Sequence, residues 1–387
     1  MIRIGFSGIL LSIFLQVVSQ EVQPVAVLSK HTGSVTSLGW SPDGTLLVSG
    51  SEDKTAVIWK KDSWEPAAVL SGAHVRSVMA VVFSADGQKI YTGGDRTIVA
   101  WNTDGTKDKA IGTTVVDIWS LSLAPGGKYL AAGTFEKKVH IYDLVTGAHI
   151  RALDGHEKSV LAVAWLDDNR LVSGSLDETV RIWDVPTGRI LQTLTGHGGN
   201  IYSIAAHPAT GLFATASRDN SVRLWQAGKG KSIRTFTGHD QAVMSVSLSP
   251  DSKWMLTGSY DNTVILWETT TASKIYTFSG FEKGVNAVAF NPDATLFAVG
   301  SGDGKVRVFE AGKKLFVDFY FAAEVEKELA AMPEFAPRGK DESKQEYKAR
   351  QARADVVKQE VYNRYYAKYL EILKQQDPAQ EKQSDNR

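Results

Sequence analysis

Seven aromatic residues recur along this chain at a nearly constant spacing of 41 or 42 residues. A period of this length indicates a repeat array, in which each unit is one supersecondary element that buries its apolar face only by packing against its neighbours. The repeat therefore constrains the fold more than any single motif does. The aromatic residues are Trp59, Trp101, Tyr142, Trp183, Trp225, Trp267 and Phe309.

Each unit reads as four short antiparallel strands. In the unit that ends at Trp183, residues 180–183 alternate sides as a strand requires. Turn residues of the Ser-Pro-Asp-Gly type suit a hairpin between the first and second strands, and glycine turns follow the aromatic residue. The period leaves no room for a helix in addition. The hairpin turns are expected at residues 41–44, 84–87, 249–252 and 291–294, and the later turns at Gly147, Gly188, Gly228 and Gly312.

Two further signals give the unit a family resemblance. A Gly-His pair precedes the tryptophan by about 30 residues, and an aspartate lies six residues before it. In these residues the chain resembles the WD40 repeat family, whose arrays form β-propellers. The resemblance implies an all-β fold, a seven-bladed β-propeller of four-stranded antiparallel blades, which we place over residues 24–320. The composition of the remaining residues predicts a C-terminal α-helical tail. The aspartates are Asp53, Asp95, Asp177, Asp219, Asp261 and Asp303, and the third unit departs from the pattern with Glu136.

The same resemblance implies a buried hydrogen-bonded network within a blade, made of the histidine, a serine or threonine, the aspartate and the tryptophan. Such sets look like catalytic Ser-His-Asp groups, but a nucleophile must be accessible and faced by oxyanion donors. The set occurs five times, which suits a structural role because buried polar groups need partners. The sets are His31, Ser49, Asp53 and Trp59; His74, Thr92, Asp95 and Trp101; His156, Ser173, Asp177 and Trp183; His197, Thr215, Asp219 and Trp225; and His239, Thr257, Asp261 and Trp267.

Two units lack the complete set. The third has no Gly-His pair and carries Ala132 in place of the hydroxyl residue, while the seventh has Phe281, Val299 and Phe309 around a retained Asp303. An all-apolar exchange of a polar network can be nearly neutral, whereas deleting one partner is costly. Asp303 must therefore find another donor, and these two blades are expected to be the most irregular.

Propellers of the WD40 family mostly act as rigid platforms that bind partners where the central channel opens, so the resemblance implies a non-catalytic scaffold for a protein or peptide. Two positions per repeat usually face this opening, one in the first strand and one directly before the aspartate. In blades 3 to 6 these positions have the aromatic and apolar composition of interface hot spots. The alternatives are coverage of this patch by the C-terminal tail and plain packing in the channel. The predicted partner-binding residues are Trp119, Phe135, Leu161, Leu176, Tyr202, Arg218, Met244 and Tyr260, and the equivalent positions elsewhere are Thr36, Met79, Asn286, Glu52, Gly94 and Gly302.

Composition and motifs argue against several function classes. The 43 basic and 43 acidic residues balance, which gives no overall field for nucleic acid or an anionic membrane. The absence of cysteine excludes disulfides, thiolate metal sites and a thiol nucleophile. No phosphate-binding loop, nucleophile elbow or dinucleotide fingerprint occurs. We therefore expect no catalytic residue, cofactor or metal, and the competing hypothesis is an enzyme or metal-dependent hydrolase in the central channel.

The first residues differ in composition from all that follow. Met1 and Arg3 precede a mostly apolar run that ends at Val18, which predicts a signal peptide over residues 1–19 with cleavage near Ser19 and Gln20. The run is shorter than the roughly 20 apolar residues that span a bilayer, so no stable membrane span is expected. The interpretation predicts a secreted or periplasmic protein, and the alternative is an uncleaved apolar terminus packed on the protein.

Two segments compete to close the ring as the outer strand of the seventh blade. In the WD40 family the strand that leads into Gly-His belongs to the preceding blade, so residues 24–28 would lie beside residues 305–309. Residues 314–320 follow a glycine turn, as outer strands do elsewhere in the chain. We expect residues 24–28 to take this place and residues 314–320 to cover a face or side of the ring.

A charged tail is expected over residues 321–387. A short helix is predicted at about residues 322–332, and Ser343 and Glu346 have the form of a capping box that opens a long helix over residues 343–376. Residues 378–387 are expected to be disordered.

The long helix carries its larger side chains on one stripe, at steps that follow the helical period. The stripe is expected to dock on the propeller itself. The alternatives are that it binds a partner or self-associates, which would make the tail an assembly module, or that the helix is a solvated stalk. The stripe consists of Val357, Val361, Tyr365, Tyr369 and Ile372.

Overall fold

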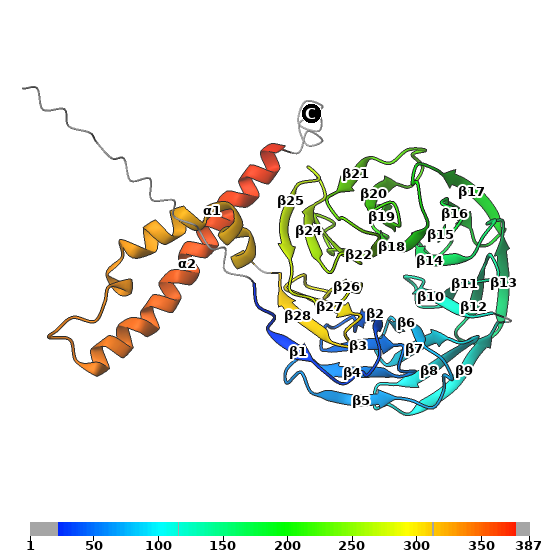
Figure 1. The fold of residues 1–387 in the computed structure, drawn as a ribbon, viewed down its shortest axis with the longest axis horizontal. Coiled ribbons are helices and arrows are strands. Elements are labelled where there is room, and N and C mark those ends of the chain that lie inside the picture. Colours follow the sequence, from blue (N-terminus) through cyan, green and yellow to red (C-terminus); the bar gives the residue numbers. More distant parts are fainter. Residues whose placement is uncertain (1–21, 115, 312, 377–387) are drawn as a thin grey trace, which may run out of the picture.

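A ring of seven blades around a central channel dominates the structure, a computed structural model that describes residues 22–114, 116–311 and 313–376 (Figure 1). Within these ranges, 28 strands form seven antiparallel sheets of four strands each. The predicted fold class, a seven-bladed propeller with a C-terminal helical tail, is confirmed. The predicted signal peptide and its cleavage site, Gly312 and the predicted disordered end lie outside the described residues.

Blades 1 to 3 follow one another along the chain. Blade 1 consists of β2 (Val35–Trp40), β3 (Leu46–Ser51), β4 (Ala56–Lys60) and β5 (Pro66–Leu70). Blade 2 consists of β6 (Val78–Phe83), β7 (Lys89–Gly94), β8 (Thr97–Asn102) and β9 (Lys107–Thr113). Blade 3 consists of β10 (Ile118–Leu123), β11 (Tyr129–Thr134), β12 (Lys138–Asp143) and β13 (His149–Asp154).

The remaining blades continue the order, and only the last one differs in connectivity. Blade 4 consists of β14 (Val160–Trp165), β15 (Arg170–Ser175), β16 (Val180–Asp184) and β17 (Arg189–Leu194). Blade 5 consists of β18 (Ile201–His207), β19 (Leu212–Ser217), β20 (Ser221–Gln226) and β21 (Arg234–Thr237). Blade 6 consists of β22 (Val243–Leu248), β23 (Trp254–Ser259), β24 (Val264–Glu268) and β25 (Lys274–Phe278). Blade 7 joins β26 (Val285–Phe290), β27 (Leu296–Ser301) and β28 (Val306–Glu310) to β1 (Ala26–Leu28) from the start of the chain.

The pairing of β1 with β28 closes the ring. Ala26 lies opposite Val308 and Leu28 opposite Val306 in antiparallel register, and the backbone N–H of Val25 adds a hydrogen bond to the carbonyl of Val308 at 2.8 Å. The prediction that residues 24–28 complete the seventh blade is therefore confirmed. β1 occupies the edge of β28 that the competing segment would have joined, and that segment forms a helix, which satisfies its backbone groups internally.

The cores lie between neighbouring blades, where apolar side chains from the two sheets meet. Between blades 4 and 5, for example, Leu194 and Phe213 are both fully buried, and Trp225 packs in the same cluster. Serine hydroxyls link the inner strands across the same seams: Ser245 Oγ accepts a hydrogen bond from the backbone N–H of Val288 at 3.0 Å. Each blade thus depends on its neighbours for burial, as the repeat period predicts.

Two helices and a short 3-10 helix follow the ring. They are α1 (Lys313–Ala330), which has a non-helical residue at Phe321, η1 (Pro333–Phe335) and α2 (Lys344–Gln376). The predicted capping box is confirmed: the Ser343 hydroxyl accepts from the N–H of Glu346, whose carboxylate accepts from the N–H of Ser343. Residue 320, the predicted end of the propeller, lies inside α1. None of the helices in the described ranges is both long and apolar enough to cross a membrane.

The tail is anchored to blade 6 by stacked aromatic rings. Trp254 of β23 stacks on Phe316 of α1 with ring centroids 4.2 Å apart and on Tyr369 of α2 at 5.7 Å. Val361 and Tyr369, two residues of the predicted stripe, are buried, and Tyr365 is half-buried beside Phe321. The stripe therefore packs inside the protein, whereas the side chain of Ile372 lies outside the described side chains.

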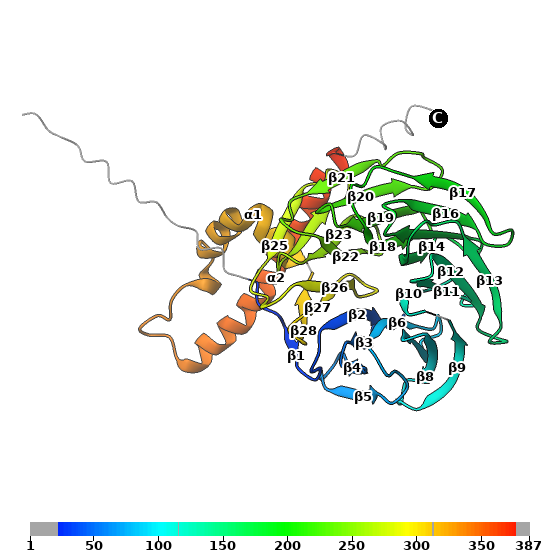
Figure 2. The ribbon, with the colours of Figure 1, turned by 45° about the vertical axis from the view of Figure 1, so that its right-hand side comes forward.

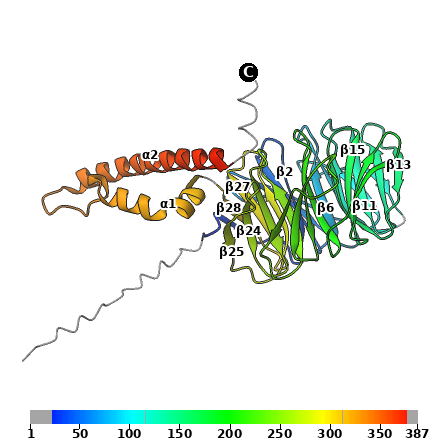
Figure 3. The same ribbon diagram turned by 90° about the horizontal axis from the view of Figure 1, so that it is seen from above.

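Seen from three sides, the tail leaves the ring sideways. The hairpin of α1 and α2 stands beside the edge formed by blades 6 and 7 (Figures 1 and 2), and it projects away from the ring when the propeller is viewed edge-on (Figure 3). It does not lie over the channel. Coverage of the channel opening by the described part of the tail, one of the alternatives for the aromatic patch, is therefore excluded.

Candidate functional site

A β-bulge at the same place in each inner strand builds the opening of the channel. In blade 3, Ile118 pairs with Thr134 and Ser120 pairs with Gly133, so Trp119 between them has no partner. Such a bulge bends the strand and re-aims a side chain. The residue skipped in the register of each blade is Thr36, Met79, Trp119, Leu161, Tyr202, Met244 or Asn286.

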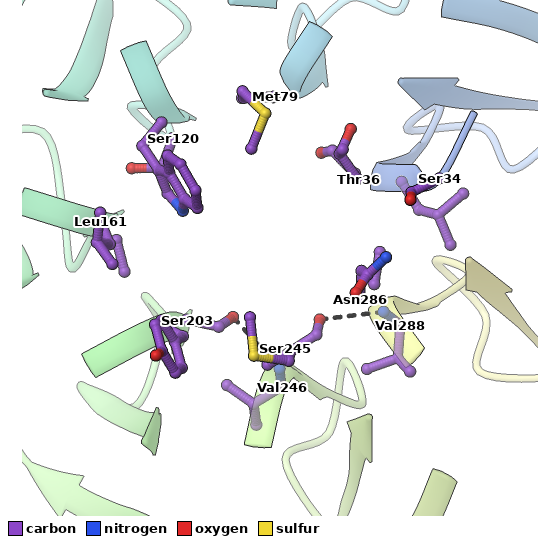
Figure 4. A pocket seen from close by; sticks show the side chains of 18 of the residues that line it. Ser34, Thr36, Met79, Ser120, Leu161, Ser203, Ser245, Val246, Asn286 and Val288 are labelled. Carbon is purple, nitrogen blue, oxygen red and sulfur yellow. Dashed lines mark hydrogen bonds between the residues drawn. The ribbon is translucent and has the colours of Figure 1, made fainter. Parts of the chain in front are cut away.

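These seven residues all line a central cavity of about 650 Å³ (Figure 4). Two of them also join neighbouring blades: the Thr36 hydroxyl donates to the carbonyl of Val78, and the Asn286 amide donates to the carbonyl of Val35 at 3.1 Å. The first-strand position identified from the repeat therefore faces the channel in every blade.

The second predicted position, directly before the aspartate, contributes unequally. Of the predicted partner-binding residues at this position, Tyr260 lines the channel, whereas Phe135, Leu176 and Arg218 lie outside its lining. Phe135 is 41% exposed and packs edge-on against Trp119, with ring centroids 5.2 Å apart, so it extends the aromatic surface outward. Leu161, in contrast, lines the channel but is buried.

Tyr260 occupies a defined place in the opening. Its ring packs over the backbone of Gly284 in the next blade, where an added Cβ would lie only 2.7 Å from its Cδ1. Burial, together with the nearby Tyr202 and the charge of Glu52, raises the pKa of the Tyr260 hydroxyl. The ring is nevertheless 47% exposed. Aromatic surface is thus held rigidly and remains accessible.

Other residues that line the opening were not predicted from the sequence. Ser34, Gln241 and Lys283 line the channel from the turns that precede the inner strands, and Ser120 and Ser203 line it one residue beyond the bulge. A signal for the serines was present, because they recur at one fixed step after the bulged residue. The turn residues vary in type from blade to blade, so the repeat pattern does not predict that they line the channel.

Within five blades, the histidine, hydroxyl residue, aspartate and tryptophan form one hydrogen-bonded network. In blade 5, His197 Nδ1 lies 2.8 Å from Asp219 and Nε2 lies 2.7 Å from Thr215 Oγ1, which also accepts the indole N–H of Trp225 at 2.9 Å. The sets beginning at His31, His74, His156 and His239 have the same geometry.

The donors and acceptors of a network follow from its two ends. An indole N–H can only donate and a carboxylate can only accept, so the arrangement suits a hydroxyl that donates to Nε2 and a histidine whose Nδ1–H donates to the aspartate. Burial alone would raise the pKa of Asp261, but hydrogen bonds from His239 and Thr263 outweigh it and lower the pKa to about 2. The hydroxyls are fully used as partners of buried groups, which leaves no exposed nucleophile in these sets.

The two blades without a complete network have a substitute that the sequence analysis missed. In blade 7, Arg307 Nη2 donates to the Asp303 carboxylate at 2.7 Å and the guanidinium lies over the Phe281 ring. In blade 3, His140 Nε2 is hydrogen-bonded to the Glu136 carboxylate. Both partner residues, Arg307 and His140, lie two places before the aromatic residue that closes the unit, and this position was the available signal.

The expected irregularity of these two blades is not seen in their strands. Both have four strands and the same bulge as the others. The physical reason is that each acidic residue finds a partner on its own hairpin, so no buried charge is left unpaired. Among the residues that the structure describes, no group of three or more histidine, aspartate or glutamate side chains is arranged to hold a metal ion.

Comparison with known families agrees with the geometry. Residues 22–60, 64–102, 111–143, 147–184, 188–226, 230–268 and 272–310 match the family described as WD domain, G-beta repeat. The chain belongs to the WD40 family.

Relatives of this WD40 chain are larger proteins. Transcription initiation factor TFIID subunit 5 of Caenorhabditis elegans is 28% identical over 144 residues, which cover 37% of this chain and 22% of that protein. Protein HIR1 of Candida albicans is 30% identical over 31% of the chain and 15% of its own length. Elongator complex protein 2 of Danio rerio is 30% identical over 38% and 20%. The chain thus spans only 15% to 22% of these relatives.

The same relatives correct the prediction of export. TFIID subunit 5, the HIR1 proteins and the Elongator protein are nuclear or cytoplasmic, which points away from a secreted or periplasmic protein. The prediction rested on an apolar run with a single arginine before it. Hydrophobicity alone does not distinguish an export signal from an apolar segment with another role.

Proposed function

We propose that this WD40 chain is a non-catalytic scaffold that binds a protein or peptide partner at the channel opening of blades 3 to 6. The observation that carries the proposal is the set of seven bulged residues around one cavity, which is aromatic or apolar in blades 3 to 6 at Trp119, Leu161, Tyr202 and Met244. Large aromatic side chains near the centre of a surface are the usual energetic anchors of interfaces.

Two features of the surroundings support this choice of surface. Tyr260 and Phe135 are 47% and 41% exposed, so aromatic area is accessible beside the half-buried Trp119 and Tyr202. The described part of the tail, up to residue 376, stands at the side of the ring and leaves the opening uncovered. The names of two relatives, a TFIID subunit and an Elongator complex protein, denote members of multiprotein assemblies, and a partner for this chain within such an assembly is in keeping with them.

The experiment replaces Trp119, Tyr202 and Tyr260 together by alanine. Proteins recovered with the wild-type chain from cells that produce it are quantified, and the binding constant of the recovered partner is then measured with purified components. A hot-spot residue contributes about 2 kcal/mol or more, and 2 kcal/mol corresponds to about 30-fold in affinity, so the triple variant should bind at least about 30-fold more weakly even if only one of the three is a hot spot.

A control variant separates loss of the site from loss of apolar surface in general. Ile190→Ala with Leu191→Ala removes exposed apolar area, 40% and 55% exposed, from the outer strand β17 of blade 4. This variant should bind like the wild type, and both variants should keep the circular-dichroism spectrum of the propeller. A triple variant that retains wild-type affinity would refute this choice of surface.

A further inference from the structure

Blade 3 carries a pair of histidines that face each other on neighbouring strands. His140 of β12 and His149 of β13 approach through Nδ1 and Nε2, which lie 2.9 Å apart, and their ring centroids are 5.0 Å apart. Five of the eight histidines of the chain belong to the blade networks. His207 is the last residue of β18, and its ring contacts Thr210 and the carbonyl of Pro250. The His140–His149 pair is outside the channel opening and outside every network.

The carboxylate of Glu136 fixes the tautomer of His140. Because a carboxylate only accepts, His140 Nε2 carries a proton and donates it, which leaves the lone pair of Nδ1 pointing toward His149. Histidines that bind metal ions usually donate their other ring N–H to a carboxylate, which orients the ring and raises its basicity. Glu136 thus gives His140 the environment of a metal ligand.

His149 is the accessible member of the pair. It is exposed, whereas the His140 side chain is only 13% exposed. The cations of the two strands are engaged elsewhere: Lys138 pairs with Asp154 at 3.3 Å, and Arg151 donates to backbone carbonyls of blade 4.

We propose that His140 and His149 form a two-histidine site for a Cu²⁺ or Ni²⁺ ion, with water in the remaining positions. Nitrogens 2.9 Å apart subtend about 90° at an ion about 2.0–2.1 Å from each. This is the angle between neighbouring ligands in square-planar or tetragonal coordination, which Cu²⁺ and Ni²⁺ prefer. Tetrahedral Zn²⁺ would need a separation of about 3.4 Å. When the ion binds, the Nε2 proton of His149 passes to water, and both rings rotate slightly so that their lone pairs point at the ion.

The test titrates the full-length chain, free of any affinity tag, with CuCl₂ and NiCl₂ at pH 7.5, using calorimetry and, for copper, electron paramagnetic resonance. We expect one ion per chain and a signal from two ring nitrogens. His149→Gln, whose amide can still hydrogen-bond His140, should weaken binding by well over tenfold. Glu136→Ala should weaken it by about tenfold, the effect typical of losing a carboxylate behind a histidine ligand.

His207→Ala is the matched control, because it removes a half-buried histidine from blade 5, outside the proposed site. It should bind copper like the wild type. Equal binding by the wild type and His149→Gln, or loss of binding only in His207→Ala, would mean that copper binds adventitiously elsewhere and would overturn the proposal. Absence of binding to the wild-type chain would overturn it as well. Circular dichroism of each variant excludes unfolding as the cause.

Discussion

The Asp303–Arg307 pair in blade 7 allows a sharp test of how a blade survives without its histidine network. Arg307→Met removes the guanidinium but keeps a long apolar side chain. The Asp303 side chain, 3% exposed, then retains the backbone N–H of Lys305 at 2.9 Å but no cation. Removing one partner of a buried ion pair costs about 3–5 kcal/mol because the other charge is left uncompensated. We expect the free energy of unfolding to fall by about this amount.

Two further variants define the cause. Asp303→Asn in the Arg307→Met background removes the stranded charge but keeps an acceptor for Lys305, so it should recover most of the loss. Arg181→Met in blade 4 is the matched control, because Arg181 lies two residues before Trp183 as Arg307 lies two before Phe309. In blade 4 the aspartate is already bonded to His156. This control should change the stability by less than about 1 kcal/mol.

The loss of stability in Arg307→Met should depend on pH in a definite direction. Burial raises the pKa of Asp303, but the hydrogen bond and charge of Arg307 outweigh it, and the pKa lies below its usual value. A lowered carboxyl pKa stabilises the fold above the unfolded pKa of about 3.9, and this contribution is lost as the pH falls through the folded pKa. In Arg307→Met the stranded, buried carboxylate has a raised pKa, so the deficit should be largest near neutral pH and shrink as the pH falls and protonation removes the unpaired charge.

Urea unfolding followed by tryptophan fluorescence and circular dichroism measures these differences. The reasoning is refuted if Arg307→Met unfolds within about 1 kcal/mol of the wild type at pH 7, or if the double variant is as unstable as the single one. Either result would mean that the Asp303 carboxylate is satisfied without Arg307.

Two other predictions concern the networks and the tail. The pKa values of Asp177, Asp219 and Asp261 are lowered, the last to about 2. The wild-type protein should therefore stay folded at pH 4 and lose stability progressively toward pH 2. Acid unfolding that is complete above pH 4 would contradict this prediction. Trp254→Ala should lower the free energy of unfolding by about 3–5 kcal/mol and make α2 sensitive to trypsin while the ring stays resistant. The control is Trp165→Ala, which removes a buried tryptophan remote from the tail and should leave α2 protected.

The ring itself was predictable because each unit repeats one local pattern. Strand alternation, a hairpin turn and a closing aromatic residue recur seven times, so an error in one unit is corrected by the other six. The channel residues of the inner strands could be found for the same reason, since the bulge sits at one fixed step in every unit. The period therefore predicts that positions such as Trp119 and Tyr202 face the channel.

What the sequence left open depends on contacts that do not repeat. Residues 314–320 suit a strand by composition, but β1 occupies the edge of β28, and residues 314–320 are helical. The position before the aspartate points toward the channel at Tyr260 but outside its lining at Leu176 and Arg218, and nothing in the unit distinguishes these cases. The ion pair between Asp303 and Arg307 could have been inferred from their spacing, but it has no counterpart in the regular blades.

The pairing of β1 with β28 sets the order in which the blades of this protein can form while the chain is synthesised. Leu28 and its partner Val306 are about 280 residues apart, so at roughly 5–20 residues per second a ribosome needs about 14–56 s between them. During that interval blades 1 to 6 can assemble in sequence as they emerge, while β1 has no strand to join. The first strand made is thus among the last to be placed, and any factor that guards the nascent chain would have to hold the segment around Ala26 for that time.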